Sequence, residues 1–245
     1  MRQYIYGIRA ILEAIESGTQ IEKILFKKHS KSNIFYKLRQ IAKKYQIPVQ
    51  YVPIEKLNKI TRQNHQGAIA YISPISFCNI DELISNIFDK GQIPIFLILD
   101  RITDVHNFGA IVRTAECSGI SGIIVPRKNT ALISSDAMKT SAGALNYVPI
   151  VKMILSEAVD KLHQAGFQII AATEKAKQNF YEIDFTVPSA IIMGSEEKGI
   201  SFELLKKSDF HAKIPIIGKI ESLNVSVASA LFMYEAIRQR LFVKK

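Results

Sequence analysis

The chain has 245 residues, of which 48% are hydrophobic, and its 32 lysine and arginine residues against 22 acidic ones give a net charge of +10. These values predict a soluble globular protein with one large or two small domains, and the charge favours polyanionic partners such as nucleic acids. The longest apolar runs, such as residues 93–99, are far shorter than the roughly 20 residues needed to cross a bilayer. No cleavage site of small residues follows the N-terminal helix pattern, so we expect a cytoplasmic protein without a signal peptide.

The two cysteines, Cys78 and Cys117, lie in no CxxC motif and in no cluster of cysteine and histidine residues. Metal sites and a disulfide framework are therefore not expected. Cys117 is predicted to be a buried small residue on a helix.

The first 73 residues are predicted to form a small α/β domain. Their hydrophobic periodicity indicates, in chain order, helices over 7–17 and 32–45 and strands over 21–26, 49–52 and 67–72. The second of these helices carries five lysine and arginine residues from Lys31 to Lys44. This basic run fits a nucleic acid-binding surface and a solvated helix face equally well.

A helix that begins near Asn79 or Asp81 and ends at Gly91 is interpreted as a linker over residues 74–92. From residue 93 onwards, predicted strands alternate with predicted helices. The strands are 95–100, 122–126, 148–153, 167–173, 190–196 and 211–217, and the helices are 107–119, 134–143, 155–166, 200–208 and 231–241. Such alternation predicts an α/β fold with a mostly parallel sheet covered on both faces.

Ligands of such folds usually bind outside the carboxyl ends of the strands. Three strands are followed there by polar, glycine-containing loops, over residues 101–109, 195–199 and 217–224. None of them has the dinucleotide, Walker or serine-nucleophile pattern of glycines. In addition, SLNVSVASA (222–230) places asparagine and serine at the start of a helix, where such side chains compete with the backbone for hydrogen bonds.

Three motifs, taken together and in this order, resemble those of the SpoU/TrmH-type RNA ribose 2′-O-methyltransferases of the SPOUT superfamily. They are NFGAIVR (107–113), IIMGSEEKG (191–199) and IPIIGKIESLNVSVASA (214–230). With RQNHQGAIA (62–70) in front, nearly the whole chain is similar to the bacterial 23S rRNA (guanosine-2′-O)-methyltransferases of that family.

The resemblance implies a trefoil-knotted methyltransferase domain over residues 93–245 and a ribosomal-protein-like RNA-binding domain over residues 1–73. It also implies a homodimer with a shared active site, S-adenosyl-L-methionine as cofactor, and methylation of a guanosine ribose 2′-OH in 23S rRNA. The catalytic and substrate-positioning residues would be Asn107, Arg113, Glu196, Asn224 and Ser226. Main-chain groups around Gly194, Ile214 and Leu223 would hold the cofactor, and no metal is implied.

RNA contacts are assigned to the loop residues Arg62, Asn64, His65 and Gln66. A basic cluster in the same domain fits this role, and its members are Lys27, Lys28, Lys31, Lys37, Arg39, Lys43 and Lys44. His65 taken alone is more typical of a turn or capping residue.

The candidate catalytic residues have other interpretations when each is taken alone. Asn107 also fits a helix N-cap, Glu196 an acid near a helix start, and Arg113 a surface arginine. Because a guanidinium stays protonated at ordinary pH, Arg113 is a poor literal base. We expect it to stabilise developing alkoxide charge or to hold a phosphate, and the base role is the alternative.

One departure from the family pattern concerns Glu197, since relatives commonly have a glycine there. A glycine with positive φ at this position would leave Glu197 strained. Two other functions fit the sequence: a tRNA ribose 2′-O-methyltransferase, or a non-catalytic RNA-binding factor in ribosome assembly.

Overall fold

The computed structural model describes residues 3–28, 32–131 and 133–241. The chain splits into two compact units, which we describe separately. The first comprises Met1–Ser76 with Ile133–Ser135, and the second Phe77–Leu132 with Asp136–Lys245.

The first unit contains a four-stranded mixed sheet in the order β1-β4-β2-β3. The strands are β1 (Tyr4–Tyr6), β2 (Ile21–Lys27), β3 (Val49–Val52) and β4 (Ala68–Ile72). β2 and β3 are parallel, whereas β4 is antiparallel to both β1 and β2. β3 therefore forms one edge of this sheet.

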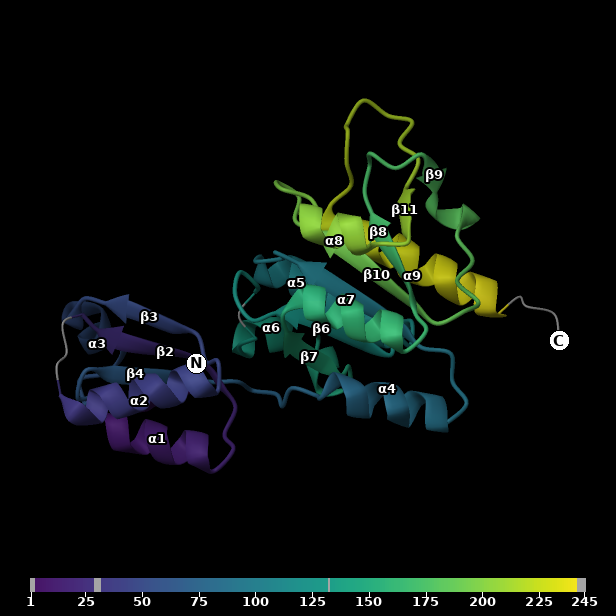
Figure 1. Cartoon of the computed structure of the whole chain (residues 1–245). Helices are drawn as coiled ribbons and strands as arrows, with labels where there is room; N and C mark the ends of the chain where they lie inside the picture. Colours follow the sequence, from purple (N-terminus) through teal and green to yellow (C-terminus); the bar gives the residue numbers. More distant parts are fainter. Residues whose placement is uncertain (1–2, 29–31, 132, 242–245) are drawn as a thin grey trace. The chain divides into compact units, whose positions relative to one another are not determined.

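Helices cover both faces of this sheet. α1 (Ile8–Glu16) and α2 (Asn33–Lys44) lie side by side and share a core with Ile24 and Phe26 of β2 (Figure 1). α3 (Ile54–Ile60) packs Leu57 against Leu25 on the opposite face. The α/β character is as predicted, but β1 and α3 were not expected from the sequence pattern.

The second unit is built on a seven-stranded sheet in the order β7-β6-β5-β10-β8-β11-β9. All of its strand pairs are parallel, which confirms the prediction of a mostly parallel sheet. The strands are β5 (Ile95–Asp100), β6 (Gly122–Pro126), β7 (Ile150–Met153), β8 (Gln168–Ala172), β9 (Gln178–Asn179), β10 (Ser189–Gly194) and β11 (Phe210–Lys213).

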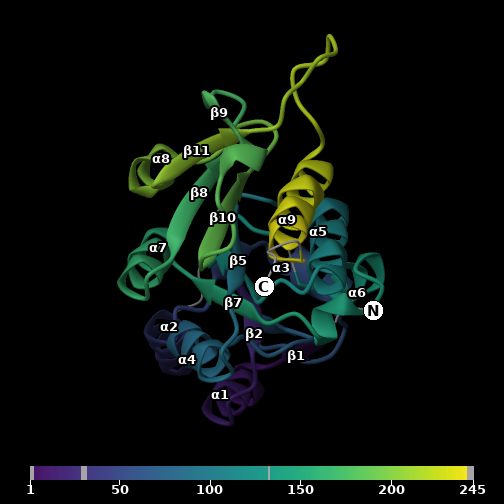
Figure 2. The ribbon, with the colours of Figure 1, turned by 90° about the vertical axis from the view of Figure 1, so that its right-hand side faces the viewer.

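Helices pack on both faces of this second sheet (Figure 2). One face carries α4 (Ile80–Asp89), α7 (Leu155–Gln164) and α8 (Phe202–Lys207). α5 (Val105–Cys117) and α9 (Val225–Leu241) lie side by side on the other face. The remaining helical segments are α6 (Ser135–Thr140) and the 3₁₀ turns η1 (Ala144–Asn146) and η2 (Phe180–Glu182). Within the described residues, no helix combines the length and apolar character needed to span a membrane.

α4 begins where the sequence predicts, because the Asn79 side chain accepts hydrogen bonds from the backbone N–H groups of Asp81 and Glu82. Ile80 and Ile84 of this helix are buried in the core of the second unit. The stretch 74–92, interpreted from sequence as a linker, therefore holds a core helix.

Cys117 is exposed, so the prediction of a buried thiol is wrong. It lies in the last turn of α5, whose buried face is formed by residues such as Val112 and Ala115.

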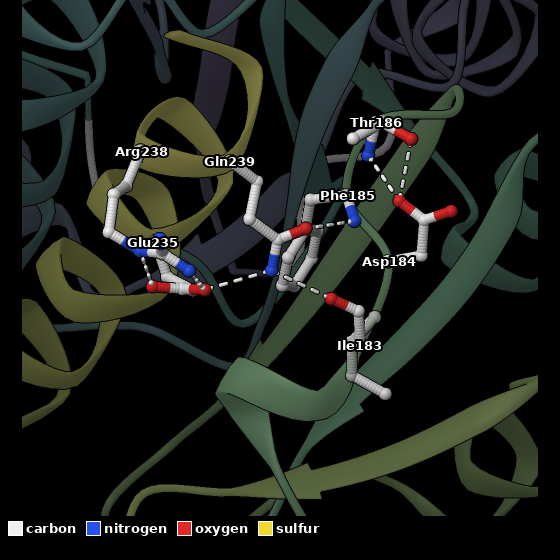
Figure 3. Close-up of polar contacts among 7 residues, drawn as sticks. All are labelled: Ile183, Asp184, Phe185, Thr186, Glu235, Arg238 and Gln239. Carbon is white, nitrogen blue, oxygen red and sulfur yellow. Dashed lines mark hydrogen bonds and ion pairs between the residues drawn. The ribbon is translucent and has the colours of Figure 1, made fainter. Parts of the chain in front are cut away.

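The C-terminal half of α9 is fastened to the segment that precedes β10 (Figure 3). Gln239 accepts a hydrogen bond from the Phe185 N–H and donates one to the Ile183 carbonyl, both at 2.8 Å. One turn earlier, Glu235 pairs with Arg238 at 2.8 Å, and the hydrogen bond from Arg238 is the main cause that lowers the pKa of Glu235. Arg240 donates to the carbonyls of Phe185 and Val187 at 2.8 and 3.1 Å. These contacts fix the axis of α9, whose other end lies at the candidate site.

Candidate active site

The polar loops predicted to meet at the carboxyl edge of the second sheet do meet there. The loop after β5 leads into α5, the loop after β10 spans 195–199, and the segment after β11 runs through 214–224 into α9. Because β5, β10 and β11 are strands of one parallel sheet, their carboxyl ends point the same way.

Four of the five predicted catalytic residues form one hydrogen-bonded cluster. Asn224 Nδ2 donates to Asn107 Oδ1 at 2.9 Å and to Glu196 Oε1 at 2.8 Å. Ser226 donates to Asn224 Oδ1 from its hydroxyl at 2.5 Å and from its backbone N–H at 2.9 Å. Glu196 Oε1 also accepts the Val225 N–H at 3.1 Å. Glu196 and Asn224 therefore accept the first N–H groups of α9, and Asn224 connects its start to the turn after β10 and to α5.

Asn107 is not the N-cap of α5. That position is taken by Asp104, whose Oδ1 accepts the backbone N–H of Asn107 at 2.7 Å. The side chain of Asn107 is thus available to contact Asn224, and the N-cap interpretation of Asn107 is wrong.

Arg113 is the one predicted catalytic residue that lies outside this cluster. Its side chain is exposed on α5 and forms no hydrogen bond or ion pair with any residue of the described part of the chain. Six residues after Asn107, it is rotated by about 240° around the helix axis, at about 100° per residue. Among the described residues of one chain, this guanidinium is therefore unpaired.

A pocket of about 390 Å³ adjoins the cluster, and its wall includes all three residues predicted to hold a cofactor, Gly194, Ile214 and Leu223. Glu196 lines the same pocket, so one carboxylate belongs to both pocket and cluster. Apolar side chains, among them Ile216 and Phe232, supply much of the remaining wall.

The turn after β10 depends on two glycines. A Cβ on Gly194 would lie 2.2 Å from the carbonyl carbon of Gly199, and Ser195 and Gly199 form a β-bridge. Gly199 itself has φ of 60°, in the left-handed region that favours glycine. Glu197 does not have positive φ, so the strain considered for it is not present.

Comparison with known proteins places this arrangement in a family. The profile described as SpoU rRNA Methylase family matches residues 94–234. The chain belongs to this family of RNA methyltransferases. A second profile, described as RNA 2′-O ribose methyltransferase substrate binding, matches residues 4–78.

Two relatives of this SpoU-family chain match it over almost their full length. It is 32% identical to the TrmH family tRNA/rRNA methyltransferase YacO of Bacillus subtilis, over 97% of this chain and 96% of the relative. It is 35% identical to a TrmH family tRNA/rRNA methyltransferase of Staphylococcus haemolyticus, over 96% of this chain and 95% of the relative.

Solved structures of the family share the fold. AviRb from Streptomyces viridochromogenes, in complex with the cofactor AdoMet, superposes with a TM-score of 0.61 at 23% identity, over 97% of this chain and 90% of that one. The TrmH/SpoU tRNA modifying enzyme of A. aeolicus superposes with a TM-score of 0.57 at 30% identity, over 66% of this chain and 84% of that one.

Two residues that support the site were not singled out from the sequence. Asp100, at the end of β5, accepts the backbone N–H of Ser201 at 2.7 Å. Arg101 donates to the carbonyl of Gly199 at 3.0 Å and pairs with Asp100, although its φ of 61° is unusual for a residue with a side chain. Together they clamp the turn that carries Glu196. The signal in the sequence was their place at the end of a buried strand and directly after it.

The loop residues assigned to RNA contact differ in accessibility. Arg62 and Asn64 are exposed. His65 is buried: its Nδ1 accepts the Gly67 N–H at 3.0 Å, and its Nε2 is 2.8 Å from Asn58 Oδ1. Gln66 Oε1 accepts the Ile8 N–H at the start of α1. The His65 ring thus stabilises a turn, as its interpretation in isolation suggests, and RNA contact stays a prediction for the loop. Lys31 of the basic cluster lies outside the described residues.

Proposed function

We propose that this chain transfers a methyl group from S-adenosylmethionine to the ribose 2′-OH of a guanosine in 23S rRNA. The observation that carries the proposal is the cluster of Asn107, Glu196, Asn224 and Ser226, which adjoins a pocket of cofactor size through Glu196. The profile match over residues 4–78 supports the ribose 2′-O chemistry.

The pocket residues fit the cofactor. Close packing of Gly194 on Gly199 leaves main-chain groups at the pocket wall, where amide and carbonyl groups can bind an adenosyl moiety. Ile214, Leu223 and Phe232 offer apolar surface to a purine ring. When bound, S-adenosylmethionine supplies an electrophilic methyl group on a sulfonium.

The task of the chain is then mainly to orient the ribose. The asparagine and serine side chains can hold hydroxyl groups of the ribose, and most of the rate gain comes from fixing its 2′-oxygen in line with the methyl. Glu196 holds Asn224 and the first turn of α9 in place. As the methyl group moves from the sulfonium to the 2′-oxygen, the hydroxyl proton passes to solvent and the sulfur leaves as a neutral thioether. Arg113 stabilises the negative charge that develops on the oxygen.

The position of Arg113 supports a shared active site in a homodimer. Its guanidinium has no hydrogen-bond or ion-pair partner among the described residues, the cluster of its own chain included. Val227, Leu231 and Tyr234 form an exposed, mostly apolar face of α9, at spacings of four and three residues. Burial of this face against a second copy, with Arg113 serving the partner's cluster, completes the site. The proposal includes the trefoil knot that the family resemblance implies for residues 93–245.

The choice of 23S rRNA, as in RlmB-type enzymes, rests on the sequence resemblance that includes the front domain. The names of the relatives stop at tRNA/rRNA methyltransferase. A tRNA substrate is the second candidate, because the solved A. aeolicus relative is a tRNA modifying enzyme.

The test is the transfer of labelled methyl groups to unmodified 23S rRNA and, in parallel, to bulk tRNA. A single labelled guanosine in 23S rRNA is the expected result. Label in tRNA alone would show that the substrate is tRNA and that the methyl-transfer reaction is as proposed. Absence of label from both, with no binding of S-adenosylmethionine, would contradict the proposal and favour an assembly factor.

A further inference from the structure

Nearly all of the net charge of the chain lies in the first unit. Residues 1–76 hold 13 lysine and arginine residues against four acidic ones, so nine of the ten excess positive charges belong to this segment. No acidic residue occurs between Glu22 and Glu55, a stretch that contains eight lysine and arginine residues. A polyanion is the ligand that such a field attracts.

α2 directs part of this charge to one side. Its Phe35, Leu38 and Ala42 are buried in the core. Tyr36, Arg39 and Lys43 are exposed, and their spacing of three and four residues places them together on another side of the helix. An aromatic ring thus stands next to two cations.

The edge strand β3 extends this surface. Tyr51 is 43% exposed, and the guanidinium carbon of Arg39 lies 6.0 Å from the centroid of its ring. The ring of Phe26, a core residue, packs against the inner side of Tyr51, with the two ring centroids 5.9 Å apart. Tyr36 is 51% exposed. We call Tyr36, Arg39, Lys43 and Tyr51 the α2–β3 surface.

Arg39 lies over the Tyr51 ring, and no carboxylate of the described residues neutralises the cations of this surface. Within the described residues, neither Arg39 nor Lys43 forms an ion pair with a carboxylate, and the same is true of the neighbouring Lys37 and Lys44. A merely solvated helix face usually mixes both signs of charge, and it does not need two exposed aromatic rings. Exposed rings among unpaired cations are instead the arrangement that stacks bases and holds phosphates.

We propose that the α2–β3 surface binds a single-stranded segment of the RNA substrate. An unpaired base stacks on Tyr51, and Arg39 and Lys43 hold the adjoining phosphates. This inference rests on the proposed function and adds to it that the first unit binds an unpaired part of the RNA. The binding residues differ from the loop residues 62–66 that the sequence suggested.

The experiment measures the affinity of the full chain for two labelled probes by fluorescence anisotropy: a 12-nucleotide oligouridylate and a blunt 12-base-pair RNA duplex. Tyr51→Ala should weaken oligouridylate binding at least fivefold, since a stacked base contributes about 1–3 kcal/mol. It should leave duplex binding within twofold. Tyr51→Phe, which keeps a ring, should bind the oligouridylate like the wild type. Arg39→Ala should weaken both probes and lower the salt dependence by about one ion.

Two matched controls share the chemistry but lie elsewhere. Tyr181 is 50% exposed in the second unit, and Arg9 is exposed on α1, so Tyr181→Ala and Arg9→Ala should leave oligouridylate binding nearly unchanged. Equal weakening of both probes by Tyr51→Ala, or no weakening of either, would overturn the stacking site.

Methyl transfer and cofactor binding by the same proteins separate the two proposals. If the wild-type chain methylates RNA but Tyr51→Ala does not weaken oligouridylate binding, the binding surface is wrong and the methyltransferase activity stands. Tyr51-dependent binding without transfer to any RNA would keep the surface and reject the methyltransferase activity.

Discussion

Asn224 donates a hydrogen bond to Glu196 at 2.8 Å, which joins the start of the last helix to the turn after β10. The same amide nitrogen reaches Asn107 on α5 at 2.9 Å. One side chain therefore connects three segments that are far apart in the sequence, and it does so beside the pocket. The orientation of this amide is the feature on which the proposed catalysis most depends.

Asn224→Ala should lower methyl transfer about 100-fold, because the cluster loses the group that fixes its geometry. Its stability should fall by only about 1 kcal/mol, the usual cost of losing a helix N-cap. Asn79→Ala is the matched control, since Asn79 caps α4 in the same way far from the cluster. It should lose similar stability and keep its activity. Comparable activity losses in both variants would show that Asn224 acts only through folding.

If the active site is shared, a mixed dimer of two inactive variants should regain methyl-transfer activity. Arg113→Ala and Asn224→Ala are co-expressed with different tags and purified through both. The mixed dimer contains one intact site of two, so it should show about half of the wild-type transfer rate. Purified mixed dimers that stay inactive would place Arg113 in the site of its own chain or outside the mechanism. Failure of the tags to co-purify would reject the dimer.

Gly194→Ala should unfold the turn that carries Glu196. The new Cβ would sit 2.2 Å from the Gly199 carbonyl carbon, and such overpacking typically costs about 1–3 kcal/mol. Binding of S-adenosylmethionine should be lost with it. At Gly218 a Cβ meets nothing within 4 Å and φ is not positive, so Gly218→Ala should be nearly neutral. Thermal unfolding and calorimetric titration measure both effects. Equal behaviour of the two variants would contradict the close packing at Gly194.

Two substitutions of Arg101 distinguish the effect of its backbone strain from the effect of its side-chain contact. Arg101→Gly and Arg101→Ala both remove the hydrogen bond to Gly199, but only glycine accepts φ of 61° without strain. The glycine variant should therefore be about 1 kcal/mol more stable than the alanine variant. Both should bind S-adenosylmethionine more weakly than the wild type. Wild-type affinity in both would show that Arg101 does not position the turn.

The Glu235–Arg238 pair predicts a pH dependence of stability. The pKa of Glu235 is lowered in the folded chain, chiefly by the hydrogen bond from Arg238, from an ordinary value of 4.5. The unfolded chain therefore binds its proton at higher pH than the folded chain does. The stabilisation is present above about pH 4.5 and is lost as the pH falls through the folded value. Urea unfolding between pH 3 and 6 should show a shallower decline for Glu235→Gln than for the wild type. Glu157→Gln, at an exposed position, is the control. If stability declines with falling pH equally in Glu157→Gln and Glu235→Gln, the Glu235–Arg238 pair does not cause the pH dependence.

The sequence predicted the parallel sheet and its helices well, because long strands such as 95–100 are continuous apolar runs bounded by clear turn residues. It did not indicate α3, a seven-residue helix that is too short for a clear period, or the two-residue strand β9. The residues of the site were found through motifs, yet their contacts depend on the fold. Asp104 rather than Asn107 caps α5, and both choices suit the sequence.

The role of Arg101 could not be foreseen for a related reason. Its positive φ accompanies a hydrogen bond to Gly199, a residue 98 positions away. Likewise, the concern about Glu197 depended on a backbone angle that only the three-dimensional turn defines. The basic run from Lys31 to Lys44 left two interpretations open, and the exposure of Tyr36 and Tyr51 is what favours a binding surface.

The chemical identity of the product shows whether the cluster directs methylation of a ribose. Unmodified 23S rRNA is incubated with the wild-type chain and labelled S-adenosylmethionine, digested to nucleosides, and analysed by chromatography coupled to mass spectrometry. Label is expected in 2′-O-methylguanosine, at one equivalent per RNA, and it should be nearly absent with Asn224→Ala. Label on a nucleobase, or undiminished ribose methylation by Asn224→Ala, would contradict the proposed role of the cluster.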